Sequence, residues 1–524
     1  MSVAASLILD TESPSQVSRQ MRKKRKLHNY DSLVPSSRQR RPADRTDELR
    51  AKLRVLKLAS PAVPAANVPN TQFKSVAQRD ITSAGKPSAN RFKAQWNRKR
   101  GHAISFAGLF VFTFLVYFRP YELFPTLSWL SKSAMVVALI TIAAFVPAQL
   151  SLENRITAKP PEIKLVLGLL VTGLLSVPLA LNPARAFQSF TEYLKVIVMF
   201  VVMVNVLRTP RRLTNLILLV LLASCVLSLG ALNDYRLGNL ALQGRRIAGV
   251  IGGLFSNPND LALHLVTMIP ISLGLMLGSR SSLKKFLFLG CAVLLIAGMV
   301  ATFSRGGFLG FICVIAFLVW KFAPRNRIVF GIVALTVVTA TIAIAPGYRS
   351  RLSDINDASA VARTDDLKRS ILVAARHPAF GVGMDNYIIY SNSNKTTHNA
   401  YTQVAAEMGV VALLIYFAFL ITPFRRLRQI EQATWSAKDK PSIYYLAIGL
   451  QASLVAYMVV SFFASVAYLW YAYYLVAYCI CVRRIHEGSS ADLPSTPEPK
   501  LSGDPLNNRR VALRPTIAGV QGGR

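Results

Sequence analysis

The sequence THNAYTQVAAEMG, residues 397–409, follows a polar stretch of about fifty residues (347–398) and opens a long apolar segment. Most of the chain between residue 102 and the start of that polar stretch consists of apolar runs. A hydrophilic stretch of this length between membrane-spanning segments is where chemistry in water can take place. We therefore expect a fold of membrane-spanning helices with one large polar loop, which ends at this stretch.

Composition supports this interpretation. Of 524 residues, 52% are hydrophobic, and the mean hydropathy is +0.37, which is too apolar for a soluble protein of this size. The apolar residues form about twelve runs of spanning length, with approximate cores at 102–118, 131–149, 163–181, 193–207, 212–231, 258–278, 285–302, 307–323, 327–346, 399–422, 442–464 and 466–482. These runs predict an all-α polytopic membrane protein of about twelve transmembrane helices, with the large loop between helices 9 and 10.

The net charge of +36 is concentrated in the first hundred residues and in short loops between apolar runs. This distribution favours membrane topology and anionic lipid over nucleic acid as its explanation, because every loop on the side of the N-terminus is then basic. Residues 1–100 and 483–524 have the composition of disordered cytoplasmic tails, on either side of a transmembrane domain at 101–482. Both termini are expected inside and the loop 347–398 outside.

A few arginines lie on the expected exterior side, against that bias, and are therefore functional candidates. Arg245 and Arg246 precede a glycine-rich segment in which Asn257 and Asn259 open a helix. Cationic side chains and the free N–H groups of a helix N-terminus suit an anion site. A re-entrant turn whose polar groups satisfy one another explains the same residues equally well.

Arg305 lies in the turn TFSRGGFLG (302–310), where it either contacts a ligand or reaches from the helix end to the membrane surface. Within the large loop, residues 362–377 are predicted to form a helix, with Thr364 as its cap, acidic residues Asp365 and Asp366 in its first turn, and Pro378 after its end. Its apolar residues at helical spacing should pack on the membrane domain: Leu367, Ile371, Leu372 and Ala375.

His398 stands at the start of the tenth predicted span. An imidazole there can accept a proton from a hydroxyl nucleophile, although an ordinary histidine at the membrane interface fits the pattern equally well. The sequence has no paired carboxylate motif, no His/Cys cluster and no GxxxxGK loop, so neither a bound metal nor another cofactor is indicated.

In this order, RIAGVIGGLFSNPNDLA (246–262), TFSRGGFLG, HPAFGVGMDNY (377–387) and THNAYTQVAAEMG resemble the O-antigen ligase and polymerase family of bacterial membrane glycosyltransferases. The resemblance implies a glycan donor on undecaprenyl diphosphate in the bacterial inner membrane, a periplasmic active site, no metal, and inversion at the transferred sugar. It assigns His398 to activation of the acceptor hydroxyl and Arg246 and Arg305 to diphosphate binding.

By the same resemblance, Arg363 lines the site, Arg245 can replace Arg246, and Glu407 orients His398 or pairs with an arginine. The acceptor is a hydroxyl of a glycan, of lipid A core or of a protein, and the partners are this donor, the acceptor and membrane lipids. The motifs do not separate a ligase from a polymerase that joins repeat units. A lipid-linked glycan transporter or flippase is the alternative of another class, disfavoured because the sequence has no internal repeat and few carboxylates within the spans.

Overall fold

The computed structural model describes residues 101–239, 247, 255, 257–322, 331–332, 335–336, 339, 358–391, 395–436 and 441–491. All elements assigned within these ranges are helices, which confirms the predicted all-α class. The predicted N-terminal tail lies outside the described residues, as do Arg245, Arg246 and most of the predicted span 327–346.

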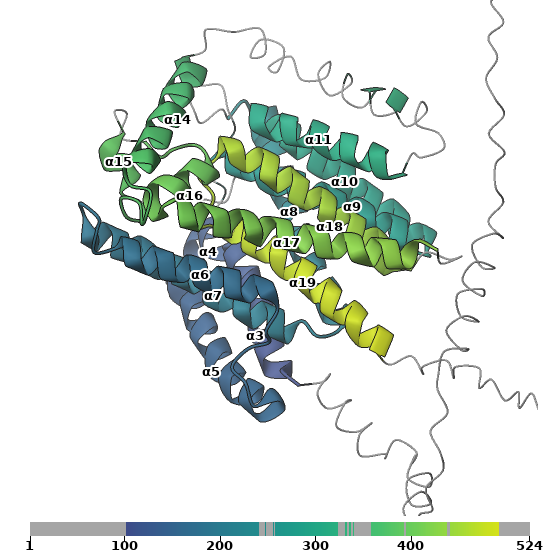
Figure 1. Cartoon of the computed structure of the whole chain (residues 1–524). Coiled ribbons are helices and arrows are strands. Elements are labelled where there is room, and N and C mark those ends of the chain that lie inside the picture. Colours follow the sequence, from purple (N-terminus) through teal and green to yellow (C-terminus); the bar gives the residue numbers. More distant parts are fainter. Residues whose placement is uncertain are drawn as a thin grey trace, which may run out of the picture. The chain divides into compact units, whose positions relative to one another are not determined.

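The helices are, in chain order, α3 (Ala103–Phe118), α4 (Pro120–Leu123), the 3-10 helix η1 (Pro125–Lys132), α5 (Ser133–Glu153), α6 (Pro161–Ser176), α7 (Pro183–Val206), α8 (Pro210–Leu237), α9 (Pro258–Gly278), α10 (Ser282–Ala301), α11 (Arg305–Phe322), α14 (Ala358–Arg376), α15 (Tyr387–Tyr390), α16 (Ala400–Met408), α17 (Val410–Trp435), α18 (Ser442–Val460), the 3-10 helix η3 (Ser461–Phe463) and α19 (Trp470–Ala491). Figure 1 shows their arrangement.

Nine helices among the described residues are long and apolar enough to cross a membrane, so the chain is a multi-pass membrane protein. The predicted total of twelve is not confirmed. Helix α6, at the predicted span 163–181, has only 16 residues. Helix α19, at the predicted span 466–482, extends to Ala491 and carries Arg483, Arg484 and Glu487 in its second half.

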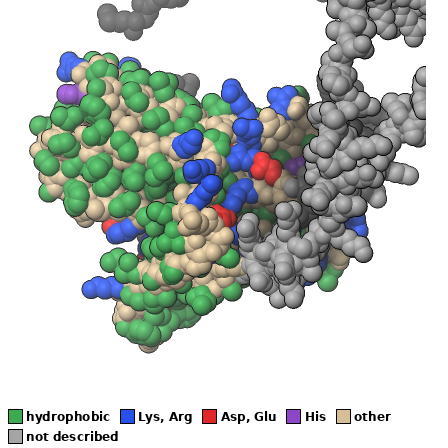
Figure 2. Space-filling view, turned by 60° about the horizontal axis from the view of Figure 1, so that its bottom comes forward, with side chains coloured by type: hydrophobic (Ala, Val, Ile, Leu, Met, Phe, Trp, Pro, Cys, Tyr) green, Lys and Arg blue, Asp and Glu red, His purple; other side chains and the backbone are tan. Residues whose placement is uncertain are grey.

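Large hydrophobic side chains cover much of the surface of these helices, as Figure 2 shows for one face. Leu139 on α5, Leu222 on α8 and Leu414 on α17 are each more than half exposed. Such a surface is costly in water and is expected of helices that face lipid.

Helix α9 packs against α8, α10, α11 and α18, and it is the most buried of the spanning helices. Glycines bring it very close to α18. A Cβ atom on Gly274 would lie 2.8 Å from the Tyr445 carbonyl oxygen, and one on Gly449 would lie 2.5 Å from the Pro270 carbonyl oxygen. Small residues allow such backbone contact between membrane helices, where dispersion forces and not the hydrophobic effect drive association.

The predicted span 399–422 is interrupted. It consists of the short helix α16 and the first half of α17, and Gly409 separates them with a φ of 92°, a backbone conformation that favours glycine. The Val410 N–H donates to the Pro378 carbonyl oxygen at 2.8 Å, which ties the start of α17 to the loop after α14. Helix α16 is therefore a separate element at the end of the bundle.

The predicted loop helix is present as α14, but it begins earlier, at Ala358. The face expected to pack on the membrane domain is wrong: Ile371, Leu372 and Ala375 are exposed and Leu367 is half-buried. The buried positions are Asp366, Ser370, Val373 and Ala374. Polar contacts set this orientation, because Tyr387 Oη donates to the Asp366 carbonyl oxygen at 2.9 Å and hydrophobic spacing does not record that contact.

Candidate active site

Helices α14, α15 and α16 lie together at one end of the bundle (Figure 1). The turn 381–383 joins them to the rest, because Val382 N–H and Gly383 N–H donate to the carbonyl oxygens of Ala406 and Glu407 at 2.9 and 3.0 Å. Those carbonyls belong to the last turn of α16 and have no acceptor role within the helix. A small apolar cluster fills the space between the three helices: Val373, Ala374, Val382, Tyr387, Ala405 and Ala406.

His398 directly precedes α16. Asn399 caps that helix, with Oδ1 accepting from the N–H groups of Tyr401 at 2.9 Å and Thr402 at 3.1 Å. His398 itself is half-buried and has a φ of 51°, a left-handed conformation that costs a non-glycine residue about 1–2 kcal/mol. Strain of this kind is maintained only where the surroundings hold the residue in place, and it is concentrated at functional sites.

Two opposite charges act on His398 from α14. Burial lowers the pKa of the imidazole, the Arg363 guanidinium lowers that pKa further, and the Asp366 carboxylate opposes both. The neutral imidazole is therefore favoured at neutral pH, and this is the form that can accept a proton from a hydroxyl group.

Glu407 lies in α16 but faces the turn after α14 and the connection between α18 and α19. Burial raises the pKa of this carboxyl to about 8, while the N–H groups of Asp385 and Tyr387 and the Tyr468 hydroxyl favour the charged form. Glu407 is not among the charges that act on the pKa of His398. Among the carboxylates, Asp366 is the one that raises the pKa of His398, and Glu407 interacts with the turn 381–387.

Arg305 begins α11 and is half-buried. The residue two before it, Phe303, also has a left-handed backbone, with a φ of 50°. Ser304 Oγ donates to Asn259 Oδ1 at 2.9 Å, and both residues are buried. Two of the predicted site residues, Arg305 and Asn259, are in this way brought to one place from the starts of α11 and α9.

The connection between α18 and α19, residues 461–469, contacts both halves of the site. Gly306, next to Arg305, lies against this connection, because a Cβ atom there would be 2.9 Å from Phe463 Cβ. Thr397, next to His398, forms a hydrogen bond with Ser465, with the two hydroxyl oxygens 3.1 Å apart. The sequence neighbours of Arg305 and His398, which are Gly306 and Thr397, therefore contact the same short segment.

The remaining predicted residues are placed as follows. Asn257 is the N-cap of α9, and its Oδ1 accepts from the Asn259 N–H at 2.9 Å. Arg363 lies half-buried on α14. Arg245 and Arg246 lie outside the described residues.

Sequence reasoning missed the role of two acidic residues. Asp366 was expected in the first turn of its helix, whereas the early start of α14 places it in the middle, buried, with Ser391 Oγ donating to its Oδ1 at 3.4 Å. Asp385 accepts from Arg185 Nε at 2.7 Å and has a φ of 55°. The run DNY after a glycine turn is the only signal in the sequence that pointed to Asp385.

Within the described ranges, no three His, Cys, Asp or Glu side chains are grouped as they would be around a metal ion. The fold and this site define a multi-pass membrane protein in which α14, α15 and α16 lie together at the end that carries a half-buried histidine. Residues 290–417 match the family model described as O-Antigen ligase, a segment that contains Arg305, Arg363, His398 and Glu407. This segment of the chain is therefore similar to the O-antigen ligase family. No curated protein matches the sequence.

Proposed function

We propose that this protein transfers an oligo- or polysaccharide from undecaprenyl diphosphate to an acceptor hydroxyl at the periplasmic side of a bacterial inner membrane, with both chain termini in the cytoplasm. The observation that carries the proposal is His398, held with left-handed backbone beside Arg363 and Asp366, inside the segment that matches the family. A neutral imidazole next to cationic side chains suits the reaction of a hydroxyl with a donor that carries a diphosphate.

In the proposed reaction the acceptor oxygen attacks the anomeric carbon of the donor, and the bond from that carbon to the diphosphate oxygen breaks. The configuration at the sugar is inverted. His398 receives the hydroxyl proton, a role that contributes about two to four decades of rate in general-base catalysis. The diphosphate leaves with its electron pair and its charge is held by guanidinium groups.

Arg305 is the guanidinium that we assign to the diphosphate, together with Arg246 or Arg245. It stands at the N-terminus of α11, where backbone N–H groups also favour an anion. Contacts of this kind strengthen as charge develops in the transition state, so they lower the barrier to transfer. Arg363 lines the same site and favours the neutral form of His398.

The same geometry serves a polymerase, whose acceptor is the growing glycan on a second carrier lipid, so the intermediates that accumulate must decide between the two. The experiment uses cells that lack this chain, complemented with the natural sequence or with His398→Ala. Surface glycan and carrier-linked glycan are extracted in parallel. Long glycan that accumulates on the carrier identifies a ligase, and single repeat units that accumulate there identify a polymerase.

The control for this experiment is Lys368→Ala, an exposed residue on α14 for which we assign no role. It should restore the natural glycan profile, and both variants should insert into the membrane at the level of the natural chain. A normal glycan profile with His398→Ala would overturn the transferase mechanism and favour a transporter.

A further inference from the structure

A second polar site lies at the other end of the helices that support the candidate active site. It is a pocket of about 330 Å³, lined by the segment 158–161 before α6 and by Arg426, Arg483, Arg484 and Glu487. Helix α6 separates the two ends. Its Gly173 lies close to Met384 and Met408, and its first residue, Pro161, lines the pocket. Sixteen helical residues span about 24 Å.

The pocket is strongly cationic, with Lys159, Arg426, Arg483 and Arg484 in its lining. Among the described residues, carboxylates compensate the charge of Arg483. It donates to both carboxylate oxygens of the buried Glu162, at 2.7 and 3.0 Å, and its Nε lies 3.7 Å from Glu487. This bidentate pair fixes the floor of the pocket and leaves the other three cations as the source of its net positive charge.

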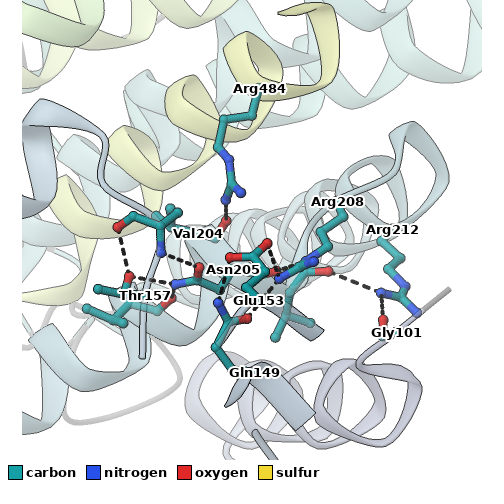
Figure 3. Close-up of polar contacts among 12 residues, drawn as sticks. Gly101, Gln149, Glu153, Thr157, Val204, Asn205, Arg208, Arg212 and Arg484 are labelled. Carbon is teal, nitrogen blue, oxygen red and sulfur yellow. Dashed lines mark hydrogen bonds and ion pairs between the residues drawn. The ribbon is translucent and has the colours of Figure 1, made fainter. Parts of the chain in front are cut away.

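Two of those cations, Arg484 and Arg426, donate to neutral groups. Arg484 Nη1 donates to the Val204 carbonyl oxygen at 2.5 Å, a contact drawn in Figure 3. Arg426 Nη1 donates to Gln429 Oε1 at 3.2 Å. Neither these two arginines nor Lys159 forms an ion pair with a carboxylate of the part of the chain that the structure describes. Their charges are therefore available to an anion.

The pocket lies where apolar sequence ends on each element that forms it. The apolar half of α17 ends at Phe424, and Arg425 follows. Helix α19 is apolar up to Val482, and the apolar part of α6 begins at Leu165, after Lys164. Figure 2 shows Lys and Arg side chains gathered across one face, with hydrophobic side chains on both sides and few Asp or Glu. Such a change from apolar to cationic marks the depth of lipid headgroups.

The two helices beside the pocket also offer an apolar surface. Leu167 and Val171 on α6, and Leu414 and Ile421 on α17, are each more than a third exposed. A free phosphate ion would use only the cations, whereas a phospholipid would use the cations for its phosphate and these side chains for its acyl chains.

We propose that this pocket is a binding site for the phosphate group of an anionic membrane phospholipid, with Lys159, Arg426 and Arg484 as the groups that recognise it. The site is separate from the one assigned to glycan transfer and does not depend on that function. The recognising chemistry is a phosphate ester, and the source to which we commit is a lipid and not a soluble phosphate.

The test uses the purified full-length chain in a neutral detergent, stripped of lipid. Phosphatidylglycerol, phosphatidylcholine and inorganic phosphate are titrated separately while the midpoint of thermal unfolding is measured. Binding to the folded state alone raises that midpoint with ligand concentration. Phosphatidylglycerol should raise it at low salt, less so at high salt, and inorganic phosphate at the same concentration should have no effect.

The decisive variant is Lys159→Gln with Arg426→Gln, two exposed residues whose loss should leave the fold intact. We expect its apparent affinity for phosphatidylglycerol to fall at least about tenfold, the loss of about 1.4 kcal/mol. The matched control is Arg425→Gln with Arg428→Gln, exposed residues of the same helix that do not line the pocket. Equal binding by both variants, or an equal response to inorganic phosphate, would overturn the proposal.

Discussion

The two ends of α6, α17 and α19 are held together by different forces. At the end that carries His398, backbone hydrogen bonds join most segments, as between Val382 and Ala406, beside the partly exposed ion pair of Arg185 with Asp385, and glycines permit the close contacts. At the other end, ion pairs between side chains join them, as between Arg483 and Glu162. Figure 3 shows further polar contacts of that second end, among them Arg208 with Glu153 at 2.9 Å.

This difference explains how similar residues serve different purposes. Where the backbone supplies the structure, charged side chains such as Arg363 and Asp366 remain near a titratable histidine and can change its chemistry. Where arginines supply the structure, their charge is compensated, and only those without a carboxylate partner can recognise a ligand. Some of the arginines whose positions agree with the positive-inside rule are therefore structural, and the rule alone does not show which arginines these are.

The largest effect is expected from breaking the buried ion pair of Glu162 with Arg483, at the end of the helices that lies away from His398. Removal of one partner from a buried pair leaves an uncompensated charge and costs about 3–5 kcal/mol. Glu162→Ala should therefore lower the free energy of unfolding by about that amount, because Arg483 stays buried without its carboxylate. The measurement is the unfolding of purified protein in detergent, followed by helix content.

The matched control for that variant is Glu192→Ala. Glu192 pairs with Lys195 at 2.5 Å, but the two side chains are 65% and 49% exposed. Exposed pairs contribute at most about 1 kcal/mol. Equal losses for the two variants would mean that the ion pairs of the second end do not hold it together.

The next largest effect is expected on the rate of glycan transfer, at the end that carries His398. Arg305→Ala should lower the rate of glycan transfer by about two to three decades, since it removes one charged contact of about 2–4 kcal/mol to the leaving diphosphate. Arg305→Lys keeps the charge but not the planar fork, and should recover only part of the rate. Transfer is measured in membranes that contain the natural carrier-linked glycan. A rate for Arg305→Ala within about threefold of the natural chain would exclude the assigned role.

A smaller effect is expected at the glycine turn that joins α14 to α16. Gly381 has a φ of 68°, and a Cβ atom there would lie 2.3 Å from the Glu407 carbonyl carbon. Gly381→Ala combines strain with a backbone clash, so it should separate the turn from α16 and cost about 2 kcal/mol or more. Faster amide hydrogen exchange in α14 and α16, with exchange in α9 unchanged, would report this opening.

Two other glycines separate the strain from the clash. Gly238 has a φ of 69°, and no atom of the described residues lies within 4 Å of its Cβ position, so Gly238→Ala should cost only the strain, about 1 kcal/mol. Gly290 lies in α10 and also has nothing near, so its change to alanine should not destabilise the helix. If Gly381→Ala behaves like Gly238→Ala, the close contact with α16 is not what holds the turn.

The sequence was sufficient to predict the elements that follow from hydrophobicity. Its apolar runs predicted the helical class, and Pro378 predicted where the loop helix ends, because such stops act locally. Thr364 was expected to cap that helix, but α14 begins earlier, at Ala358, and Thr364 lies within it. The match to residues 290–417 confirms the resemblance found in the motifs. The number of spans was less certain, since apolar length alone does not distinguish the short helix α6 from a full span.

What could not be predicted depends on contacts between distant residues. The orientation of α14 is set by Tyr387 and Asp366, which are 21 positions apart, and no periodicity records that bond. At the break at Gly409, the Val410 N–H donates to the carbonyl oxygen of Pro378 in the loop after α14, 32 positions earlier in the chain. The charges around His398 come from α14, and so the sequence could nominate the histidine but not its neighbours.

The smallest effect tests those neighbours directly. His398 must be neutral to accept a proton, so transfer should decline only as pH falls through its pKa, which burial and Arg363 hold below the ordinary value of 6.5 and Asp366 raises. Removal of Arg363 by Arg363→Gln should move this acid limb to higher pH. Removal of the carboxylate by Asp366→Asn should move it to lower pH. Near pH 8 the histidine is neutral in all three proteins.

The measurement is the rate of transfer from pH 4.5 to 8, with each profile normalised to its own plateau. Normalisation removes any loss of donor binding in Arg363→Gln, which lowers the plateau without moving the limb. Lys368→Gln, an exposed change on the same helix, should leave the profile where it is. Shifts of the same sign in Arg363→Gln and Asp366→Asn would mean that the limb does not report His398, because opposite charges must move one pKa in opposite directions.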